Sequence, residues 1–394
     1  MSERKNSPRK PRLLILCRYY LPATQAGGGV QTLVQMIERF RDRFDFLLIC
    51  VGSDVDKIPY ATVESEVWTE IEGTPIYYLR KGSDIIGLRR LIRSAQPDAV
   101  YLNSVFSAVS VNYLLLRKLR LIPSISTVIA PNGELAEGAL KNKSFKKKPF
   151  AAAAKLFGLY ENLIWKTTAA EEQSEARKFK GAGGKIFLAS NLSPRSLLEN
   201  YAPETKPKKK VGAVRMAFLA RYLPIKNFKW LIENLFDFTG DLTIDLYGPI
   251  EDAHYWRESE KAIENLPPNV KINYKGFLKP EKVLETLSGY HFFILPTLGE
   301  NFGYVFVEAM AAGCPLIISD RTPWRDLKEK GVGWDLSLAD AEKWRKVLTF
   351  CVNMDELSYR EISSSSRKYA ERLVNDPQIE EDTLTVLHYS LKKD

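Results

Sequence analysis

Histidine is scarce in this sequence of 394 residues. His254, His291 and His388 are the only ones, so none occurs in the first 250 positions. Histidine is the commonest metal ligand and a frequent general base in proteins. A metal centre or a catalytic triad built on histidine is therefore excluded from the N-terminal half.

Cysteine is equally sparse. Cys17, Cys50, Cys314 and Cys351 stand singly in apolar segments, with no Cys-x-x-Cys pair and no histidine at ligand spacing. Isolated cysteines of this kind are typical of reduced core residues in a cytoplasmic protein. The pattern excludes a scaffold held together by disulfides.

A long hydrophobic run is also missing. The most apolar stretch, residues 149–165, contains Lys155 and Glu161, and it is shorter than the roughly 20 residues that span a bilayer. It predicts a helix of a soluble fold. Residues 1–10 are basic, but no apolar core follows them, so they predict a disordered tail rather than a secretory signal.

Charge is plentiful but unevenly shared. Hydrophobic residues make up 45% of the chain and charged residues 27%, as in ordinary soluble globular proteins. Residues 1–200 hold 30 Lys and Arg against 19 Asp and Glu, whereas residues 201–394 hold 27 against 29. The densest basic cluster lies in residues 141–148. It could face anionic lipid, a phosphorylated acceptor or nucleic acid, and a solvated loop explains it equally well.

Short apolar runs alternate with longer amphipathic stretches along the whole chain. This rhythm predicts α/β domains with parallel sheets and crossover helices. Strands are predicted at residues 12–17, 45–51, 75–79, 98–103, 124–130 and 185–189 in the first half, and at residues 214–220, 241–248, 270–276, 291–296 and 315–319 in the second.

A break in the pattern separates two series of strands. Residues 193–212 gather Pro, Lys and Gly without an apolar period, which predicts a linker. We therefore predict Rossmann-like domains at residues 11–192 and 213–376, and a C-terminal helix at residues 377–394 that returns to the first domain. Two doubly wound domains of this kind would face each other across a cleft.

The segment GENFGYVFVEAMAAGCP places Glu300 and Glu308 eight positions apart. A helix from Gly303 to Ala312 would be apolar on almost every side and therefore buried. Glu308 would lie in its middle, where a carboxylate without a partner costs several kcal/mol or takes up a proton. The two hydroxyls of a ribose could satisfy it, and an Arg or Lys of the same domain is the alternative partner.

Glu300 precedes the same helix, where a predicted strand ends. The free amides of Phe302, Gly303 and Tyr304 would form an anion-binding site at the helix N-terminus. Glycine at position 303 also lets a ligand approach the backbone closely. The arrangement suits a diphosphate flanked by a hydroxyl-rich sugar.

Two further loops could contact a diphosphate. Arg221 and Lys226 follow the first strand of the second domain, where cations can neutralise charge on a departing diphosphate. Gly27, Gly28 and Gly29 follow the first strand of the first domain and allow a phosphate to approach a helix N-terminus. They do not form the GxGxxG dinucleotide fingerprint, and a tight turn is the alternative explanation.

Several of these segments together resemble the retaining glycosyltransferases of the GT-B fold, family 4, also called glycosyl transferases group 1. The resemblance covers nearly the whole chain and is carried by PTLGENFGYVFVEAMAAGCPLIISD, ARYLPIKN and GGGVQ. In addition, APNGEL, KKKPF and RTPW followed by GVGW are similar to the branch that builds bacterial surface polysaccharides. The resemblance implies transfer of a sugar from a nucleotide-diphosphate-sugar to a glycan or lipid-linked acceptor.

The resemblance also implies roles for individual residues. Glu300 would contact the donor sugar and Glu308 the nucleotide ribose, while Arg221 and Lys226 would bind the diphosphate. We take Arg221, Lys226 and Glu300 as the catalytic candidates. The implied donor-binding residues besides Glu308 are Gly28, Gly29, Gly248, Leu278, Asn301, Phe302, Gly303 and Tyr304. No metal and no other cofactor is expected, because the family uses protein cations instead.

The acceptor side departs from the family pattern. Many members have a histidine in the N-terminal domain beside the reacting sugar, and this chain has none there. We predict that Asn132 or Glu134 supplies the polar contact and that Asn103 touches the acceptor, although the branch usually has an arginine at position 132. Asp54 and Asp56 have the spacing of a metal-binding DxD motif, but that motif belongs to another fold, and a polar loop is favoured.

Two other functions remain as alternatives. A glycoside hydrolase also uses paired carboxylates, but eight residues of helix separate them by about 12 Å, beyond the roughly 5 to 9.5 Å that hydrolases need. A GT-B protein that binds nucleotide sugars without catalysis is the other. For the transferase we expect no nucleic-acid partner. We expect a cytoplasmic location. As an extension of this hypothesis, the basic N-terminal half would contact the anionic cytoplasmic face of the inner membrane.

Overall fold

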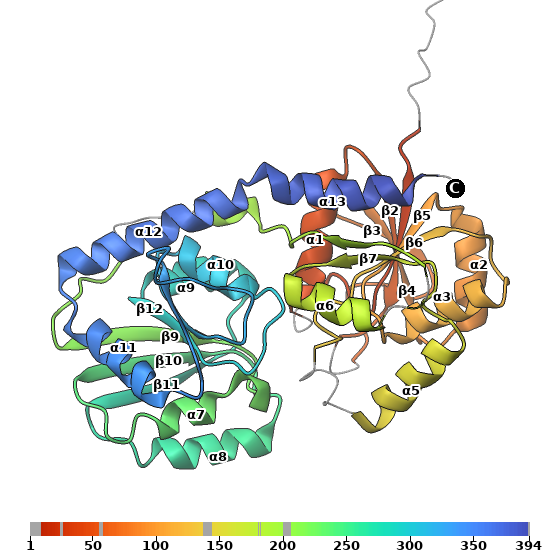
Figure 1. The fold of residues 1–394 in the computed structure, drawn as a ribbon. Coiled ribbons are helices and arrows are strands. Elements are labelled where there is room, and N and C mark those ends of the chain that lie inside the picture. The colour runs from red at the N-terminus through yellow and green to blue at the C-terminus, as the bar shows by residue number, and fades with distance from the viewer. Residues whose placement is uncertain are drawn as a thin grey trace, which may run out of the picture. The chain divides into compact units, whose positions relative to one another are not determined.

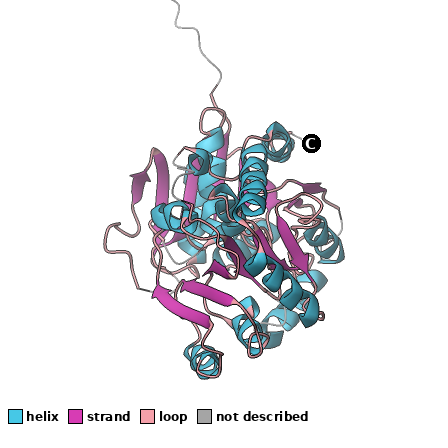
Figure 2. Cartoon of the chain, turned by 90° about the vertical axis from the view of Figure 1, so that its left-hand side faces the viewer, coloured by secondary structure: helices cyan, strands magenta, loops and turns pink. Residues whose placement is uncertain are grey.

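The computed structural model describes residues 9–23, 27–54, 58–136, 144–179, 181, 183–199 and 206–392. Most of the predicted basic tail, Asp56 and the start of the basic cluster lie outside the described residues, as do the side chains of residues 144–148. The chain divides into two compact units, one of residues 1–192 with 377–394 and one of residues 193–376. Each unit combines helices with strands (Figure 1; Figure 2).

The described part of the first unit contains one sheet of eight strands in the order β3-β4-β2-β1-β5-β6-β7-β8. Neighbouring strands are parallel except β3 and β4, which form an antiparallel hairpin. The strands are β1 (Arg12–Leu16), β2 (Asp45–Val51), β3 (Trp68–Ile71), β4 (Thr74–Leu79), β5 (Ala99–Leu102), β6 (Ser126–Ile129), β7 (Ile164–Thr167) and β8 (Ile186–Leu188). The helices are α1 (Gly28–Phe40), α2 (Ile85–Ala95), α3 (Ala108–Lys118), α5 (Ser144–Leu156), α6 (Ala170–Phe179) and α13 (Pro377–Ser390).

Two apolar cores cover the two faces of this sheet. Leu33 and Ile37 of α1 share one core with Leu384 and Leu387 of α13, while α2, α3 and α6 pack in the other. The central strand β1 is apolar from Leu13 onward, because a parallel strand covered on both faces has no polar side. The last helix of the chain therefore belongs to the first unit (Figure 1).

In the second unit the described strands form one parallel sheet in the order β11-β10-β9-β12-β13-β14. Its strands are β9 (Ala213–Leu219), β10 (Asp241–Tyr247), β11 (Val270–Gly276), β12 (Phe292–Leu295), β13 (Leu316–Ser319) and β14 (Gly333–Leu336). The helices are η1 (Arg195–Leu198), η3 (Pro224–Lys226), α7 (Phe228–Glu233), α8 (Ala253–Ile263), η4 (Pro280–Lys282), α9 (Val283–Ser288), α10 (Tyr304–Ala311), α11 (Ala341–Asn353) and α12 (Glu356–Val374). The strand order reverses between β9 and β12, so the loops that follow these two strands begin side by side.

The structure corrects one predicted element. Residues 149–165 are not one helix: α5 ends at Leu156, and β7 begins at Ile164. Gly158 and Asn162, both with positive φ, turn the chain between them. All four residues of β7 are buried in the sheet, and a short run of this kind cannot be told from a helix segment by its pattern alone.

The four cysteines are free and buried. Of the helices described, none combines the length and the apolar character needed to cross a bilayer.

Candidate functional site

The loops after β9 and β12 are joined at the point where the strand order reverses. The carbonyl of Ile225 accepts hydrogen bonds from the Thr297 hydroxyl at 3.0 Å and from the Leu298 amide at 2.7 Å. These bonds hold the segment before α10 against η3. As a result, Lys226 Nζ lies 2.6 Å from Glu300 Oε2. Two of the three predicted catalytic residues, Lys226 and Glu300, thus form one ion pair.

This ion pair is only partly shielded from solvent. The side chains of Lys226 and Glu300 are 14% and 20% exposed. Among the described residues, only the Asn301 amide donates a hydrogen bond to the second carboxylate oxygen, Glu300 Oε1, and this bond is long at 3.3 Å. That oxygen therefore keeps capacity to accept a hydrogen bond from a ligand hydroxyl.

Helix α10 begins at a position that requires glycine. Gly303 has φ 76° and ψ 69° in the left-handed region, and a Cβ there would lie 2.5 Å from Phe306 Cδ2. No side chain caps the first turn of α10. The preceding carbonyl, that of Phe302, accepts a hydrogen bond of 2.5 Å from Trp324 Nε1. The turn is thus fixed, and its N-cap residue, Gly303, has no side chain that could cap the helix.

Glu308 lies in α10 among buried neighbours, as predicted from its apolar surroundings. Part of its surface stays accessible, yet desolvation raises the pKa of its carboxyl to about 7. Within the described chain its carboxylate has no ion pair or hydrogen bond. A buried cation does reach α10, but Arg367 of α12 donates to the backbone carbonyl of Ala311, at the C-terminal end of the helix, at 2.6 Å. The alternative partner, an Arg or Lys of the same domain, is therefore not found.

Arg221 is paired with a residue that the sequence did not single out. Its Nη1 lies 3.2 and 3.3 Å from the two carboxylate oxygens of Glu251, and its side chain is 45% exposed. Arg221 follows β9 and Glu251 follows β10, so the pair bridges two neighbouring strand ends. An acidic residue shortly after a strand is the only sequence signal, and it is too common to identify a partner.

Gly248 and Leu278, predicted to line a nucleotide, have packing roles in the structure. Gly248 has φ 126°, and a Cβ there would lie 2.0 Å from the Ala220 carbonyl oxygen. Its carbonyl accepts a hydrogen bond of 2.9 Å from the Tyr274 hydroxyl. Leu278 is partly buried against the core of the second unit. These contacts give both residues a packing role, and their predicted contact with a nucleotide stays a prediction.

Three predicted positions of the first unit are linked by hydrogen bonds. The Asn103 side chain donates to the Gly29 carbonyl at 3.0 Å and accepts from Asn132 Nδ2 at 2.7 Å. Gly27, with a φ of 64°, is the N-cap residue of α1 and has no side chain to cap the helix. Gly28 is the first residue of the helix. These residues meet because β1 and β5 are neighbours in the sheet, so the segments that follow them start together.

Glu134 has a different environment from the one we expected. Its carboxylate accepts hydrogen bonds from the Ser104 hydroxyl at 2.8 and 2.9 Å and from the amides of Val105 and Phe106 at 2.6 and 3.2 Å. It therefore ties down the segment that leads into α3. Both of its oxygens accept hydrogen bonds from the protein, and the expectation that Glu134 contacts an acceptor stays a prediction.

A second buried carboxylate supports the same loop and was missed. Glu172, only 3% exposed, accepts hydrogen bonds from the amides of Gly133 at 2.5 Å and Thr168 at 2.7 Å. Nearby Lys166 is 2% exposed and donates to Asn191 Oδ1 at 3.2 Å. Desolvation lowers the pKa of Lys166 to about 8. Charged residues normally avoid the core, so nothing in the sequence marked these two as internal.

No group of three or more His, Cys, Asp or Glu side chains among the described residues is arranged to hold a metal ion. Asp54 of the DxD motif is buried, and its companion Asp56 is outside the described part. The prediction of a metal-independent protein stays a prediction.

The two Rossmann-like units together define a GT-B fold, and comparison with solved structures confirms this fold class. HepE from Anabaena, solved with UDP and glucose, matches with a TM-score of 0.69 at 16% identity, covering 96% of this chain and 100% of HepE. Sucrose-phosphate synthase from Thermosynechococcus elongatus matches with a TM-score of 0.74 at 16% identity, covering 98% and 100%. WaaG, a glycosyltransferase involved in lipopolysaccharide biosynthesis, matches with a TM-score of 0.65 at 12% identity, covering 94% and 99%.

Most of the second unit also matches a known protein family. Residues 203–368 match the family described as glycosyl transferases group 1. This segment contains Arg221, Lys226, Glu300 and Glu308. A search by sequence found no significant match among curated proteins.

Proposed function

We propose that this protein is a retaining, metal-independent glycosyltransferase of family 4. It would move a sugar from a nucleotide-diphosphate-sugar to a glycan or lipid-linked acceptor in the synthesis of a cell-surface polysaccharide. One observation carries the proposal: the Lys226–Glu300 ion pair stands beside the uncapped start of α10, inside the segment that matches the group 1 family.

The nucleotide would be held by Glu308. A carboxyl whose pKa is raised by desolvation gains most from donors that stabilise its charged form. The two hydroxyls of a ribose supply such donors and carry no charge of their own. HepE was solved with UDP-glucose as well as with UDP and glucose, and a ligand of the same chemical class suits this position.

The diphosphate would lie between the first amides of α10 and the side chain of Lys226. An ammonium group has three donors, and Glu300 Oε2 uses one of those on Lys226. The remaining donors can bind phosphate oxygens, while Glu300 limits the net positive charge. Arg221 would add a second cation from the neighbouring strand end, where its exposed side chain is already oriented by Glu251.

The reaction would proceed on one face of the donor sugar. The bond from the anomeric carbon to the diphosphate breaks, and the acceptor oxygen bonds to that carbon on the same face. The departing diphosphate oxygen takes the acceptor proton. Lys226 and Arg221 stabilise the charge that develops on the diphosphate, while Glu300 Oε1 holds a sugar hydroxyl. No protein nucleophile is required.

The acceptor would meet the first unit near Asn103 and Asn132. Asn132 Oδ1 is a buried atom without a hydrogen-bond partner in the described structure, so a hydroxyl donated by the acceptor would satisfy it. We extend the proposal to a cytoplasmic enzyme whose basic N-terminal half faces anionic lipid, where lipid-linked acceptors reside. Sedimentation with anionic vesicles at low and high salt tests that extension; binding that ignores lipid charge would count against it.

The function is tested by incubating the whole protein with UDP-, GDP- and ADP-sugars, each with and without EDTA and a lipid-linked or free glycan. We expect one nucleotide class to support transfer, with an EDTA-resistant rate and an α- or β-linkage that matches the donor. Binding of a donor without any transfer would favour the non-catalytic alternative. Release of free sugar from a glycan without nucleotide would favour the hydrolase.

A further inference from the structure

Large apolar side chains are exposed where α3 and α5 end. Leu156 and Phe157, at and just after the end of α5, are 82% and 68% exposed. Leu115, Leu119 and Leu121, in and after the last turns of α3, are exposed as well. A single exposed leucine is normal on a protein surface. Five large apolar side chains in two short segments indicate a surface that meets a partner.

Hydrogen bonds hold the two helix ends together. Lys118 Nζ donates to the Gly158 carbonyl at 3.4 Å, and Arg117 Nη1 donates to the Glu161 carbonyl at 3.0 Å. Both segments also pack inward on the same apolar core. Their exposed side chains therefore belong to one surface, which we call the apolar patch. It consists of Leu115, Leu119, Leu121, Leu156 and Phe157.

Folding does not account for the apolar patch. A helix that packs on one core normally carries polar side chains on its outer side. Leu115 and Leu119 stand four residues apart and so share one side of α3, while the residues that α3 buries, such as Leu114 and Leu116, lie in the core. The apolar outer side is thus not used within the described part of the first unit.

The charge around the patch is positive. Residues 108–121 and 150–163 contain Arg117, Lys118, Arg120 and Lys155, whereas Glu161 is their only acidic residue. Glu161 is already paired with Lys118 at 3.2 Å. Arg120 and Lys155 are exposed, and neither forms an ion pair with another described residue. Cations without a counter-charge in the described structure therefore flank the apolar side chains.

Apolar and basic side chains mixed in this way fit a bilayer that contains anionic lipid. Leucine and phenylalanine can enter the boundary of the acyl chains, while arginine and lysine stay at the level of the phosphates. A protein partner would need an apolar surface with an acidic rim matched to this place. An anionic bilayer provides apolar interior and negative charge over its whole area.

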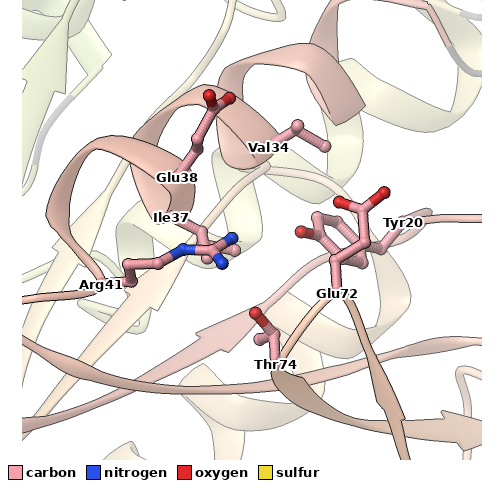
Figure 3. A pocket seen from close by; sticks show the side chains of 7 residues that line it. All are labelled: Tyr20, Val34, Ile37, Glu38, Arg41, Glu72 and Thr74. Atoms are coloured by element: carbon pink, nitrogen blue, oxygen red, sulfur yellow. The ribbon is translucent and has the colours of Figure 1, made fainter.

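A pocket beside α1 offers no comparable place for lipid. It has a volume of about 550 Å³, and charged side chains line it, among them Glu38, Arg41 and Glu72 (Figure 3). An acyl chain there would remove water from charged groups, which is costly. The pocket also borders the core on the face of the sheet opposite to α3. Lipid contact is therefore expected at the apolar patch.

We propose that the apolar patch and its flanking cations dock the protein on an anionic lipid bilayer. Leu156 and Phe157 enter among the acyl chains, while Arg120 and Lys155 bind lipid phosphates. This deepens the proposed function, on which its biological purpose rests, by naming the surface that meets the lipid. The docking itself uses no residue of the donor or acceptor set.

Sedimentation of the whole protein with vesicles tests the apolar part of the proposal. We expect the wild type to bind vesicles that contain phosphatidylglycerol, and a double variant with Leu156→Ser and Phe157→Ser to bind them at least about tenfold more weakly. The matched control carries Phe350→Ser and Leu357→Ser, because these side chains of the second unit are 56% and 72% exposed. It should bind like the wild type. Circular dichroism and thermal unfolding of each variant verify the fold.

Charge reversal tests the basic part. Arg120→Glu should weaken binding to the same vesicles about tenfold. Arg41→Glu changes the net charge of the protein equally, but Arg41 stands at the end of α1, on the other face of the sheet, and its reversal should have a smaller effect. Vesicles of phosphatidylcholine alone should bind the wild type weakly, since they carry no net negative charge.

A dye on the patch reports insertion directly. Phe157→Cys can be labelled selectively, because the four native cysteines are buried. We expect the emission of an environment-sensitive dye at this position to shift to the blue when phosphatidylglycerol vesicles are added. The emission of the same dye at Phe350→Cys should stay unchanged.

The proposal is overturned if the wild type does not bind the anionic vesicles, if the two serine double variants bind alike, or if Arg41→Glu weakens binding as much as Arg120→Glu. A dye at position 157 that stays in water on bound vesicles would overturn it as well. These measurements use neither donor nor acceptor. Failure of the proposed function would show separately, as absent sugar transfer to a soluble glycan by a protein that still binds vesicles.

Discussion

The Lys226 ammonium group lies 2.6 Å from Glu300 Oε2 although 74 residues separate the two in the chain. Both follow strands that flank the reversal of strand order, and the Ile225 carbonyl binds the loop of one to the loop of the other. The two residues for which the sequence suggested different tasks therefore form an ion pair.

Removing either member of this pair should reduce transfer. We expect Lys226→Ala to lower kcat about 100- to 1,000-fold, because a partly buried charge-stabilising donor is lost. Glu300→Gln should lower it as well, and the double variant should be no slower than the worse single one, since coupled residues are not additive. Lys229→Ala is the matched control, because Lys229 pairs with Glu258 on a neighbouring helix. Near-normal turnover of Lys226→Ala would contradict the assignment.

Arg221 should contribute through the diphosphate and not through Glu251. We expect Arg221→Ala to lower kcat about 100- to 1,000-fold, while Glu251→Gln, which keeps a hydrogen-bonding side chain beside Arg221, stays within several-fold of the wild type. Steady-state kinetics with saturating donor measure both, and Arg257→Ala serves as an exposed control on α8. Equal losses in Arg221→Ala and Glu251→Gln would assign the pair a structural role instead.

Glu308 should destabilise the free protein in neutral and alkaline solution. Its folded-state pKa of about 7 lies above the ordinary 4.5, so below pH 4.5 both states are protonated and no penalty exists. The penalty grows between pH 4.5 and 7, where only the unfolded state ionises, and is complete above pH 7 at about 3 kcal/mol or less. Glu308→Gln should therefore be more stable than the wild type at pH 8 and equal to it at pH 4.

The same substitution should weaken donor binding, because glutamine accepts fewer hydrogen bonds from a diol. Denaturant unfolding at the two pH values and calorimetric titration with nucleotide diphosphate check the two effects. A uniform loss of stability at both pH values would mean that Glu308 has a partner in the folded protein.

Gly248→Ala should lower the free energy of unfolding of the second unit, whether or not a nucleotide is bound. A Cβ would lie 2.0 Å from the Ala220 carbonyl oxygen at a φ of 126°, and we expect a loss of at least about 2 kcal/mol. Gly276→Ala is the control, because Gly276 also has a positive φ, 81°, but has open space around its Cβ position. It should cost only about 1 kcal/mol. Similar losses for both, measured by urea unfolding, would show that strain alone is responsible.

Most of the fold could be predicted from sequence because parallel strands covered on both faces are continuous apolar runs. The prediction for β2 agrees with the structure at both ends. The prediction for β11, an edge strand of alternating character, agrees as well. Elements without that pattern were missed. Strand β3 is half-exposed at the sheet edge, with Trp68 41% exposed, and β14 contains only four residues.

The candidate site was less predictable from sequence. The spacing of residues shows which side chains lie at the same edge of a sheet, but not which of them form ion pairs or hydrogen bonds with one another. Glu308 could be found because a charge in an apolar helix is conspicuous. The partners of Glu134 and Arg221 could not, because hydrogen bonds between distant loops leave no periodic trace. Gly248 was assigned to a ligand by resemblance, and its close contact with Ala220, which the sequence did not reveal, adds a packing role.

The position of α13 has a consequence for how this protein can mature. Leu384 and Leu387 complete a core whose other members come mainly from the first half of the chain, so that core stays open until α13 has left the ribosome. A fragment that stops at residue 376 would leave this apolar face bare and prone to aggregate, and the first unit cannot finish folding while the second is still being synthesised.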